Sequence, residues 1–418
     1  MSTLDKASLT NPQDDVKVQA GQVPSILSGQ VPSLPARLGK VGRSVYSQLL
    51  HRLAHYQGEI YPLHVGDTYL SPAVSMSEVE SLEHADCLAH RYTPVRGHQA
   101  LLTQVAKWLS ERQGMTVHEN EILITGGGTA GLSALVGALL APDDELLLLA
   151  PYWPLMAGAT RLHGAAPVAV PFFQEGLSIE QGIERLNQHL SPKTKALYIN
   201  TPNNPTGEVL DKAYLQALVT WASQHGLWVI SDEVYDLFCY QGEHQYTRPL
   251  DPQRVISAFS MSKAFGMAGY RCAILQGPPE VLSATERVLT NALYSAATPG
   301  QLVAHEALSE RGLAWAEQAS VAYQAVGQEA AKRLQVPAPQ GSTFLFIDVS
   351  TEVGKGGRFE SESGGVDRLL EACVDRGLLL APGSAFGPYP QHLRLCFTAA
   401  EPEVVLRGVD ILVELLGR

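Results

Sequence analysis

The chain has 418 residues, of which 45% are hydrophobic and 17% charged, a balance that excludes wholesale disorder and can supply a large buried core. At about 150 residues per domain, this length indicates two or three domains. The formal net charge of −12 argues against general affinity for nucleic acid or anionic membranes. No apolar run reaches the ~18 residues that a membrane-spanning helix needs.

Five cysteines are widely spaced and odd in number, and none forms a C-x-x-C pair. This pattern favours neither a disulfide framework nor a structural zinc site, so we expect no bound metal. It suits a reducing compartment, and we therefore expect a cytoplasmic protein.

The first 40 residues are predicted to form an N-terminal arm. They are rich in Gln, Ser, Gly and Pro and contain a short near-repeat at 21–25 and 29–33, which opposes regular helix. The arm is either disordered and draped over the surface or packed on a partner subunit. An amphipathic stripe then begins near Ser44, and residues 41–84 are expected to join the C-terminal part of the chain in a small domain.

From residue 85 to 310, short apolar runs with strand character alternate with helical patterns. Nearly continuous apolar strands between helices predict a mainly parallel sheet covered on both faces, and so a three-layer α/β large domain. The predicted strands cover 121–125, 145–150, 167–171, 196–200, 227–231, 255–260 and 271–276.

Residues 311–418 are predicted to form a smaller α+β domain. Helical sequence runs over 301–334 and again from Pro402, with strand-like segments at 341–349, 378–381 and 393–397. The polar, Gly- and Ser-rich stretch at 350–365 is expected to be a solvated loop.

Lys263 is the first candidate catalytic residue. It follows the predicted strand at 255–260, comes directly after the two hydroxyl residues Ser260 and Ser262, and precedes Arg271 by eight positions. Most lysines are solvated surface charges, but one at the end of a buried strand is partly desolvated, and its free amine can form a Schiff base with a carbonyl. The hydroxyls and the arginine suit an anionic phosphate.

Polar residues also close two neighbouring predicted strands. Asp232 ends one strand and is followed by Tyr235; Asn204 follows the other in a stiff turn with prolines and Gly207. The carboxyl ends of strands are where α/β proteins bind ligands, and a buried acid there can keep a pyridinium nitrogen protonated.

A glycine-rich turn at 126–131 lies between a strand and a helix and matches G-x-G-x-x-G. A dinucleotide site is one interpretation, but the next strand ends in Ala150 and Pro151 rather than in an acid. The other interpretation is a helix N-terminus that binds a single phosphate. Trp153, after that next strand, can stack on a flat heteroaromatic ring.

Three motifs, in this order, resemble the class I/II aminotransferases of the aspartate aminotransferase superfamily, which are fold type I pyridoxal-phosphate (PLP) enzymes. The motifs are Asn-Pro-x-Gly at 204–207, Asp-Glu-x-Tyr at 232–235, and Ser-x-Ser-Lys with its later arginine at 260–271. The resemblance covers about residues 60–410. It implies a PLP-binding large domain, a small domain, and a homodimer that shares its active sites between subunits.

The resemblance also implies roles around the cofactor ring. Lys263 would form the Schiff base with PLP and then act as the base that moves the proton. Asp232 would pair with the pyridine nitrogen, Asn204 and Tyr235 would hydrogen-bond the phenolic oxygen, and Trp153 would stack on the ring.

Further residues are implied around the phosphate and the substrate. The phosphate would be held by Gly127, Gly128, Thr129, Ser260, Ser262 and Arg271, and by Tyr92 of the neighbouring subunit. Arg394 would bind the α-carboxylate of the amino acid, with Gly66 and Asn204 beside it. The substrate side chain is not identified; Arg96 and Lys40 are candidates for a side-chain carboxylate by position alone.

We therefore expect a PLP-dependent aminotransferase that acts on an L-α-amino acid and a 2-oxo acid. The alternative is a related fold type I enzyme, such as a C–S lyase or a biosynthetic elimination or cyclisation enzyme, because the protein decides which bond of the PLP-bound substrate breaks. A regulator built on such a domain would need a basic DNA-binding module, for which the leader is too short. The last alternative is a nucleotide-dependent oxidoreductase, and only the glycine-rich turn supports it.

Overall fold

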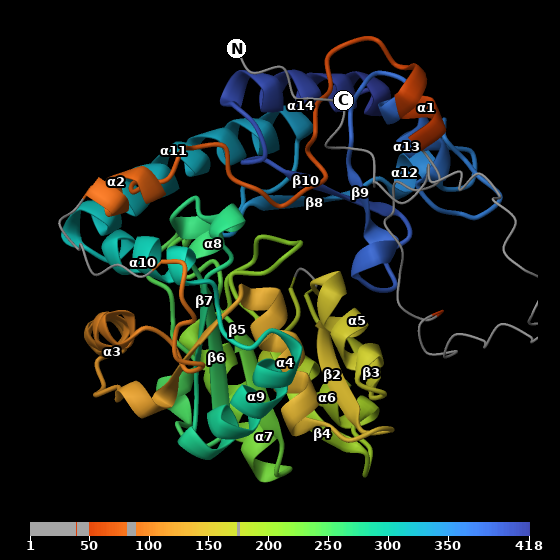
Figure 1. Ribbon diagram of the computed structural model, residues 1–418. Helices are drawn as coiled ribbons and strands as arrows, with labels where there is room; N and C mark the ends of the chain where they lie inside the picture. The colour runs from red at the N-terminus through yellow and green to blue at the C-terminus, as the bar shows by residue number, and fades with distance from the viewer. Residues whose placement is uncertain (1–38, 40–49, 82–88, 174–175) are drawn as a thin grey trace, which may run out of the picture.

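The computed structural model describes residues 39, 50–81, 89–173 and 176–418 (Figure 1). The predicted arm, the start of the helical pattern near Ser44, Lys40 and Cys87 lie outside these residues, apart from Gly39. Within the described part of the chain, no helix is both long and apolar enough to cross a membrane.

A seven-stranded sheet forms the centre of the larger part of the molecule, in the order β1-β7-β6-β5-β4-β2-β3. Only β7 runs antiparallel to its neighbours, which confirms a mainly parallel sheet. The strands are β1 (Ile122–Thr125), β2 (Glu145–Ala150), β3 (Ala166–Pro171), β4 (Thr194–Asn200), β5 (Trp228–Asp232), β6 (Val255–Ser260) and β7 (Ala273–Gln276).

Both faces of this sheet are buried. Successive strand residues point to opposite faces, so Leu146 and Leu148 pack in a different core cluster from Leu147 and Leu149. Helices α4 (Gly128–Leu139), α5 (Pro154–Leu162) and α9 (Pro279–Ala292) cover the first face, while α6 (Ile179–His189) and α7 (Lys212–Gln224) cover the second. The predicted three-layer α/β fold is confirmed.

A second, antiparallel sheet lies above the first in Figure 1, in the order β8-β10-β9. Its strands are β8 (Phe344–Asp348), β9 (Ala381–Pro382) and β10 (His392–Cys396). The two long helices α11 (Glu310–Leu334) and α14 (Pro402–Leu416) pack together beside it. Shorter helices complete this region: α1 (Leu50–His55), α2 (Met76–Ser81), α12 (Ser350–Val353) and α13 (Asp367–Val374).

Three further helices and four 3-10 turns complete the described part of the chain. They are α3 (Gln99–Gln113), α8 (Met261–Ala264), α10 (Thr298–Ala307) and the 3-10 turns η4 (Glu119–Glu121), η5 (Arg248–Leu250), η6 (Ala268–Tyr270) and η7 (Gly383–Phe386).

The helical sequence expected over 301–334 is confirmed as two helices, α10 and α11, and Ser309 caps α11 by accepting a hydrogen bond from the Gly312 amide. Two other sequence expectations were wrong in detail. The strand over 378–381 is reduced to β9, and Leu378 makes only an isolated bridge to Tyr61. The loop expected over 350–365 begins with the short helix α12.

Parallel strands end at a common edge, and here that edge carries polar groups. Asn200 ends β4, Asp232 ends β5 and Ser260 ends β6, which are adjacent strands, and all three side chains are buried. Buried polar side chains at the carboxyl edge of such a sheet mark a ligand site.

Candidate active site

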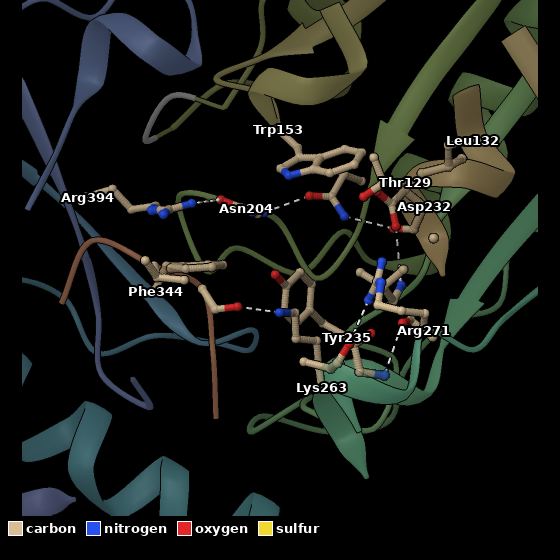
Figure 2. A pocket seen from close by; sticks show the side chains of 18 residues that line it. Thr129, Leu132, Trp153, Asn204, Asp232, Tyr235, Lys263, Arg271, Phe344 and Arg394 are labelled. Carbon is tan, nitrogen blue, oxygen red and sulfur yellow. Dashed lines mark hydrogen bonds between the residues drawn. The ribbon is translucent and has the colours of Figure 1, made fainter. Parts of the chain in front are cut away.

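A cavity of about 360 Å³ lies at this carboxyl edge, between the large sheet and the three-stranded sheet (Figure 2). It is lined by residues from segments far apart in the sequence: Val65, Gly66, Gly128, Thr129, Leu132, Trp153, Asn200, Asn204, Asp232, Val234, Tyr235, Ser260, Ser262, Lys263, Ala268, Arg271, Phe344 and Arg394. In Figure 2, Arg394 and Arg271 lie on opposite sides of the cavity, and Trp153 faces Lys263 and Tyr235 across it.

Lys263 lies on α8, the short helix that begins where β6 ends. Its Nζ donates a hydrogen bond to the Gly66 carbonyl oxygen, which ties the lysine to a segment before the large sheet. Burial lowers the pKa of this amine from its ordinary value. A lowered pKa shifts the amine toward its neutral form, which is the form that attacks a carbonyl carbon.

Asp232 is 3% exposed, and burial raises the pKa of its carboxyl to about 6. Two hydrogen bonds oppose that rise: the Tyr198 hydroxyl donates to Oδ2 at 2.6 Å, and the Val234 amide donates to Oδ1 at 3.4 Å. A nearby cation, such as a protonated ring nitrogen, would stabilise the ionised form of this carboxyl further.

An anion-binding cradle lies beside these two residues. The N-terminus of α4 opens onto the cavity at Gly128 and Thr129, where backbone amides and the helix dipole favour negative charge. Arg271 closes the cradle, with its Nη1 donating to the Ala268 carbonyl at 2.8 Å. A Cβ on Gly127 would stand 2.2 Å from Nη2 of Arg271, so only glycine lets the guanidinium come this close.

Two hydroxyls complete the cradle. Ser260 and Ser262 both line the cavity, and the Ser262 amide donates to the Ser260 hydroxyl at 3.1 Å. The cradle thus offers a set of donors suited to a phosphate: one guanidinium, the N-terminus of α4, and three hydroxyls, the third from Thr129.

Arg394 lies on the other side of the cavity, on β10, and is 8% exposed. Its Nη1 donates to Oδ1 of Asn204 at 3.0 Å and its Nη2 to the His64 carbonyl at 2.5 Å. The guanidinium carbon stands 4.3 Å from the ring centre of Phe344 and 4.7 Å from that of Phe386. Flanked in this way, the guanidinium is held in one orientation and is suited to a carboxylate.

Burial, together with the charge of Arg394, lowers the pKa of the neighbouring His64 to about 4. At neutral pH this imidazole is therefore uncharged, and Arg394 remains the cation at this end of the cavity.

The structure brings most of the predicted residues together in one cavity, with two exceptions. Gly127 lies next to the guanidinium of Arg271 but does not itself line the cavity. Tyr92 is 86% exposed and lies by a second hollow, with its ring 4.9 Å from that of Tyr294. Within its own chain, Tyr92 does not reach the Lys263 cavity.

Arg96, a candidate for binding a substrate side chain by position alone, lies outside the cavity of its own chain. It donates to the carbonyls of Asn120 at 2.8 Å and Ile122 at 3.3 Å, and it pairs with Glu286 at 3.4 Å. These contacts tie it to the start of β1, and it does not line the cavity.

Sequence reasoning missed several lining residues. Phe344 stacks on Arg394 but reads in the sequence as an ordinary apolar strand residue. Val65 and Leu132 likewise carry no chemical signal. Asn200 could have been predicted, because it ends β4 directly before the turn that holds Asn204. Its Oδ1 accepts a hydrogen bond from the Asn204 amide at 2.7 Å.

A buried lysine, a buried carboxylate, a phosphate-type cradle and a fixed arginine share one cavity at the carboxyl edge of an α/β sheet. This combination defines an enzyme for amine and carbonyl chemistry on an anionic substrate. The sequence profile described as aminotransferase class I and II matches residues 61–412, most of the chain. The chain belongs to this family, and its reaction is the transfer of an amino group between an amino acid and a 2-oxo acid.

Individual relatives agree with this assignment. The chain is 31% identical to the aspartate/prephenate aminotransferase of Thermus thermophilus over 341 residues, 78% of this chain and 84% of the relative. It is 29% identical to the arginine–pyruvate transaminase of Pseudomonas aeruginosa over 379 residues, 86% and 92% of the two chains. The solved structure of Thermus thermophilus aspartate aminotransferase with maleate matches with a TM-score of 0.80 at 26% identity, covering 92% of this chain and all of that one.

Proposed function

We propose that the carrier of the amino group is PLP, bound in the Lys263 cavity of this aminotransferase. The observation that carries the proposal is the set of groups in one cavity: a buried amine with a lowered pKa, a buried carboxylate and a phosphate-type cradle. When bound, PLP supplies an electron-accepting ring that stabilises negative charge at the substrate Cα.

In this proposal each residue of the chain has a defined task. Lys263 would hold the cofactor through Nζ and, once released, would move the proton from the substrate Cα to C4′ of the cofactor. Asp232 faces the ring nitrogen, and Tyr235 and Asn204 face the phenolic oxygen. Trp153 covers one face of the ring, and burial raises the pKa of Tyr235, which keeps its phenol protonated as a donor.

The phosphate is assigned to the cradle of Gly127, Gly128, Thr129, Ser260, Ser262 and Arg271. The substrate's α-carboxylate is assigned to Arg394, with Asn204 and Gly66 beside it. Relatives are named for acidic, aromatic and basic amino acids, so the proposal stops at an L-α-amino acid and a 2-oxo acid.

We further propose a homodimer in which Tyr92 of each chain reaches the phosphate of the other. Its exposure, and its distance from the cavity of its own chain, support this assignment. We also propose a large domain over 85–310 and a small domain made of 41–84 and 311–418, a division that the separate sheets support. The cysteine pattern supports a cytoplasmic location, and the family a role in amino-acid metabolism.

A panel of amino acids tests the proposal directly. Purified protein loaded with PLP is mixed with each amino acid, and the cofactor's absorbance and the appearance of pyridoxamine phosphate are followed. Pyridoxamine phosphate formed in proportion to oxo acid is the expected result. Pyruvate and ammonia from cysteine-type substrates, without an oxo-acid acceptor, would instead identify the lyase alternative.

A further inference from the structure

Tyr198 lies behind the cavity, on the strand next to the one that ends in Asp232. Strands β4 and β5 pair in parallel, and Tyr198 is 1% exposed. Its hydroxyl donates to Oδ2 of Asp232 at 2.6 Å, the length of a strong hydrogen bond to a carboxylate. Tyr198 is not among the described residues that line the cavity, whereas its partner Asp232 is.

The other groups that face Asp232 do less to favour its charged form. The Val234 amide donates to Oδ1 at the long distance of 3.4 Å. The charge of Glu233 raises the pKa of Asp232, and Tyr235 is the remaining titratable neighbour. Glu233 itself is held by His244 at 2.8 Å and by Ser257 at 2.6 Å. Tyr198 is thus the main donor that stabilises the Asp232 carboxylate.

We propose that Tyr198 is a positioning residue for the cofactor's ring nitrogen, holding the Asp232 carboxylate ionised and fixed through Oδ2 and leaving the other oxygen for the ring. This inference rests on the proposed function. A carboxylate that must pair with a protonated nitrogen has to remain an anion in a buried site, and burial alone works against that. A phenol with a raised pKa supplies a hydrogen-bond donor without adding a charge.

The first test uses Tyr198→Phe, which removes one buried oxygen and keeps the ring. Burial raises the pKa of Asp232 to about 6, above its value in the unfolded chain, so the folded apoprotein loses stability as this carboxyl ionises. Without the Tyr198 hydroxyl the pKa of Asp232 rises further, and the folded variant therefore continues to lose stability up to a higher pH than the wild type does. We measure the free energy of unfolding of the wild-type and Tyr198→Phe apoproteins in urea. The difference between the two, here called the stability gap, should widen from about pH 5 to about pH 8.

The matched control is Tyr240→Phe. The Tyr240 hydroxyl also makes a 2.6 Å hydrogen bond, but its acceptor is the neutral Ser342 carbonyl. Its stability gap should be the same at each pH. A gap for Tyr198→Phe that is equally independent of pH would overturn the proposal. If Tyr198→Phe does not fold, the Tyr198→Phe/Asp232→Asn variant must, because a neutral amide does not need this donor; failure of both would also overturn it.

The second test compares the affinity of the apoprotein for PLP and for its deaza analogue, in which C–H replaces the ring nitrogen. Because hydrogen bonds to charged groups contribute strongly, Tyr198→Phe should lower the ratio of PLP affinity to analogue affinity about tenfold. An unchanged ratio would overturn the positioning role and leave the proposed function intact. Wild-type protein that binds neither compound would instead overturn the proposed function, and the inference with it.

Discussion

The guanidinium carbon of Arg394 lies 4.3 Å from the centre of the Phe344 ring, and the same ring fills the space beside Gly66. One aromatic side chain thus orients the proposed carboxylate-binding arginine and packs against the segment whose carbonyl accepts from Lys263. The two ends of the proposed amino-acid site are therefore coupled through Phe344.

Replacing Arg394 with lysine tests the carboxylate assignment. Lysine keeps the charge but loses the planar fork that binds a carboxylate with two hydrogen bonds and stacks on Phe344. We expect amino-acid affinity to fall by about 2 kcal/mol, or about 30-fold, with PLP content unchanged. Titration of the cofactor's absorbance with amino acid measures this.

Arg407→Lys is the control for that titration, because Arg407 makes an exposed ion pair with Glu59 far from the cavity lining. It should titrate as the wild type does. An Arg394→Lys protein that also titrates like the wild type would show that another group binds the carboxylate.

Gly66→Ala tests the close packing beside Lys263. A Cβ at this position would stand 2.7 Å from Cζ of Phe344, so the ring or the Gly66 backbone must move. Overpacking of this kind costs about 1–3 kcal/mol, and here it also displaces the carbonyl that holds Nζ. We expect a clear loss of turnover, measured as kcat, in a protein that still folds.

Gly158→Ala provides the comparison for Gly66→Ala, because a Cβ there meets no atom within 4 Å. Adding Phe344→Leu to Gly66→Ala should recover part of the turnover by making room for the methyl group. No loss in Gly66→Ala would mean that the Gly66 segment does not fix the lysine.

The sequence predicted the residues of the sheet edge well, and the reason is geometrical. Asp232 and Ser260 end buried strands, Asn204 and Lys263 follow such strands within four residues, and the adjacent strands β4, β5 and β6 end at the same edge. Their proximity follows from the order of strands and helices alone.

The contacts between the two sheets were not predictable in this way. Arg394 was identified by resemblance, but its bonds to His64 and Asn204 join segments 330 and 190 residues away. Phe344 and Tyr198 stand next to apolar residues of their strands, so the sequence gives each the appearance of a core residue. Nothing in their local sequence shows that Phe344 stacks on an arginine and that Tyr198 donates to a buried carboxylate.

The shared-site proposal is tested by mixing inactive variants. Lys263→Ala and an impaired Tyr92→Phe protein are combined under conditions that exchange subunits. If Tyr92 serves the partner's site, one site of each mixed dimer carries both defects and the other carries neither. Activity should then rise above that of either parent.

Lys263→Ala mixed with Asp232→Ala is the control, because both residues line the same cavity of one chain and each site keeps one defect. That mixture should stay inactive. An equally inactive Tyr92 mixture, with subunit exchange confirmed by mass spectrometry, would place Tyr92 outside the partner's site.

Lys263 is proposed to bind the cofactor covalently, and borohydride reduction, which fixes such a bond, tests this. The protein loaded with PLP is reduced, digested and mapped by mass spectrometry, with the exposed Lys195→Ala as a control that should label like the wild type. We expect one phosphopyridoxyl group per chain, on Lys263, and no label on the corresponding peptide of Lys263→Ala. A label on a different lysine of the wild-type protein, or no label at all under saturating PLP, would show that Lys263 does not bind the cofactor.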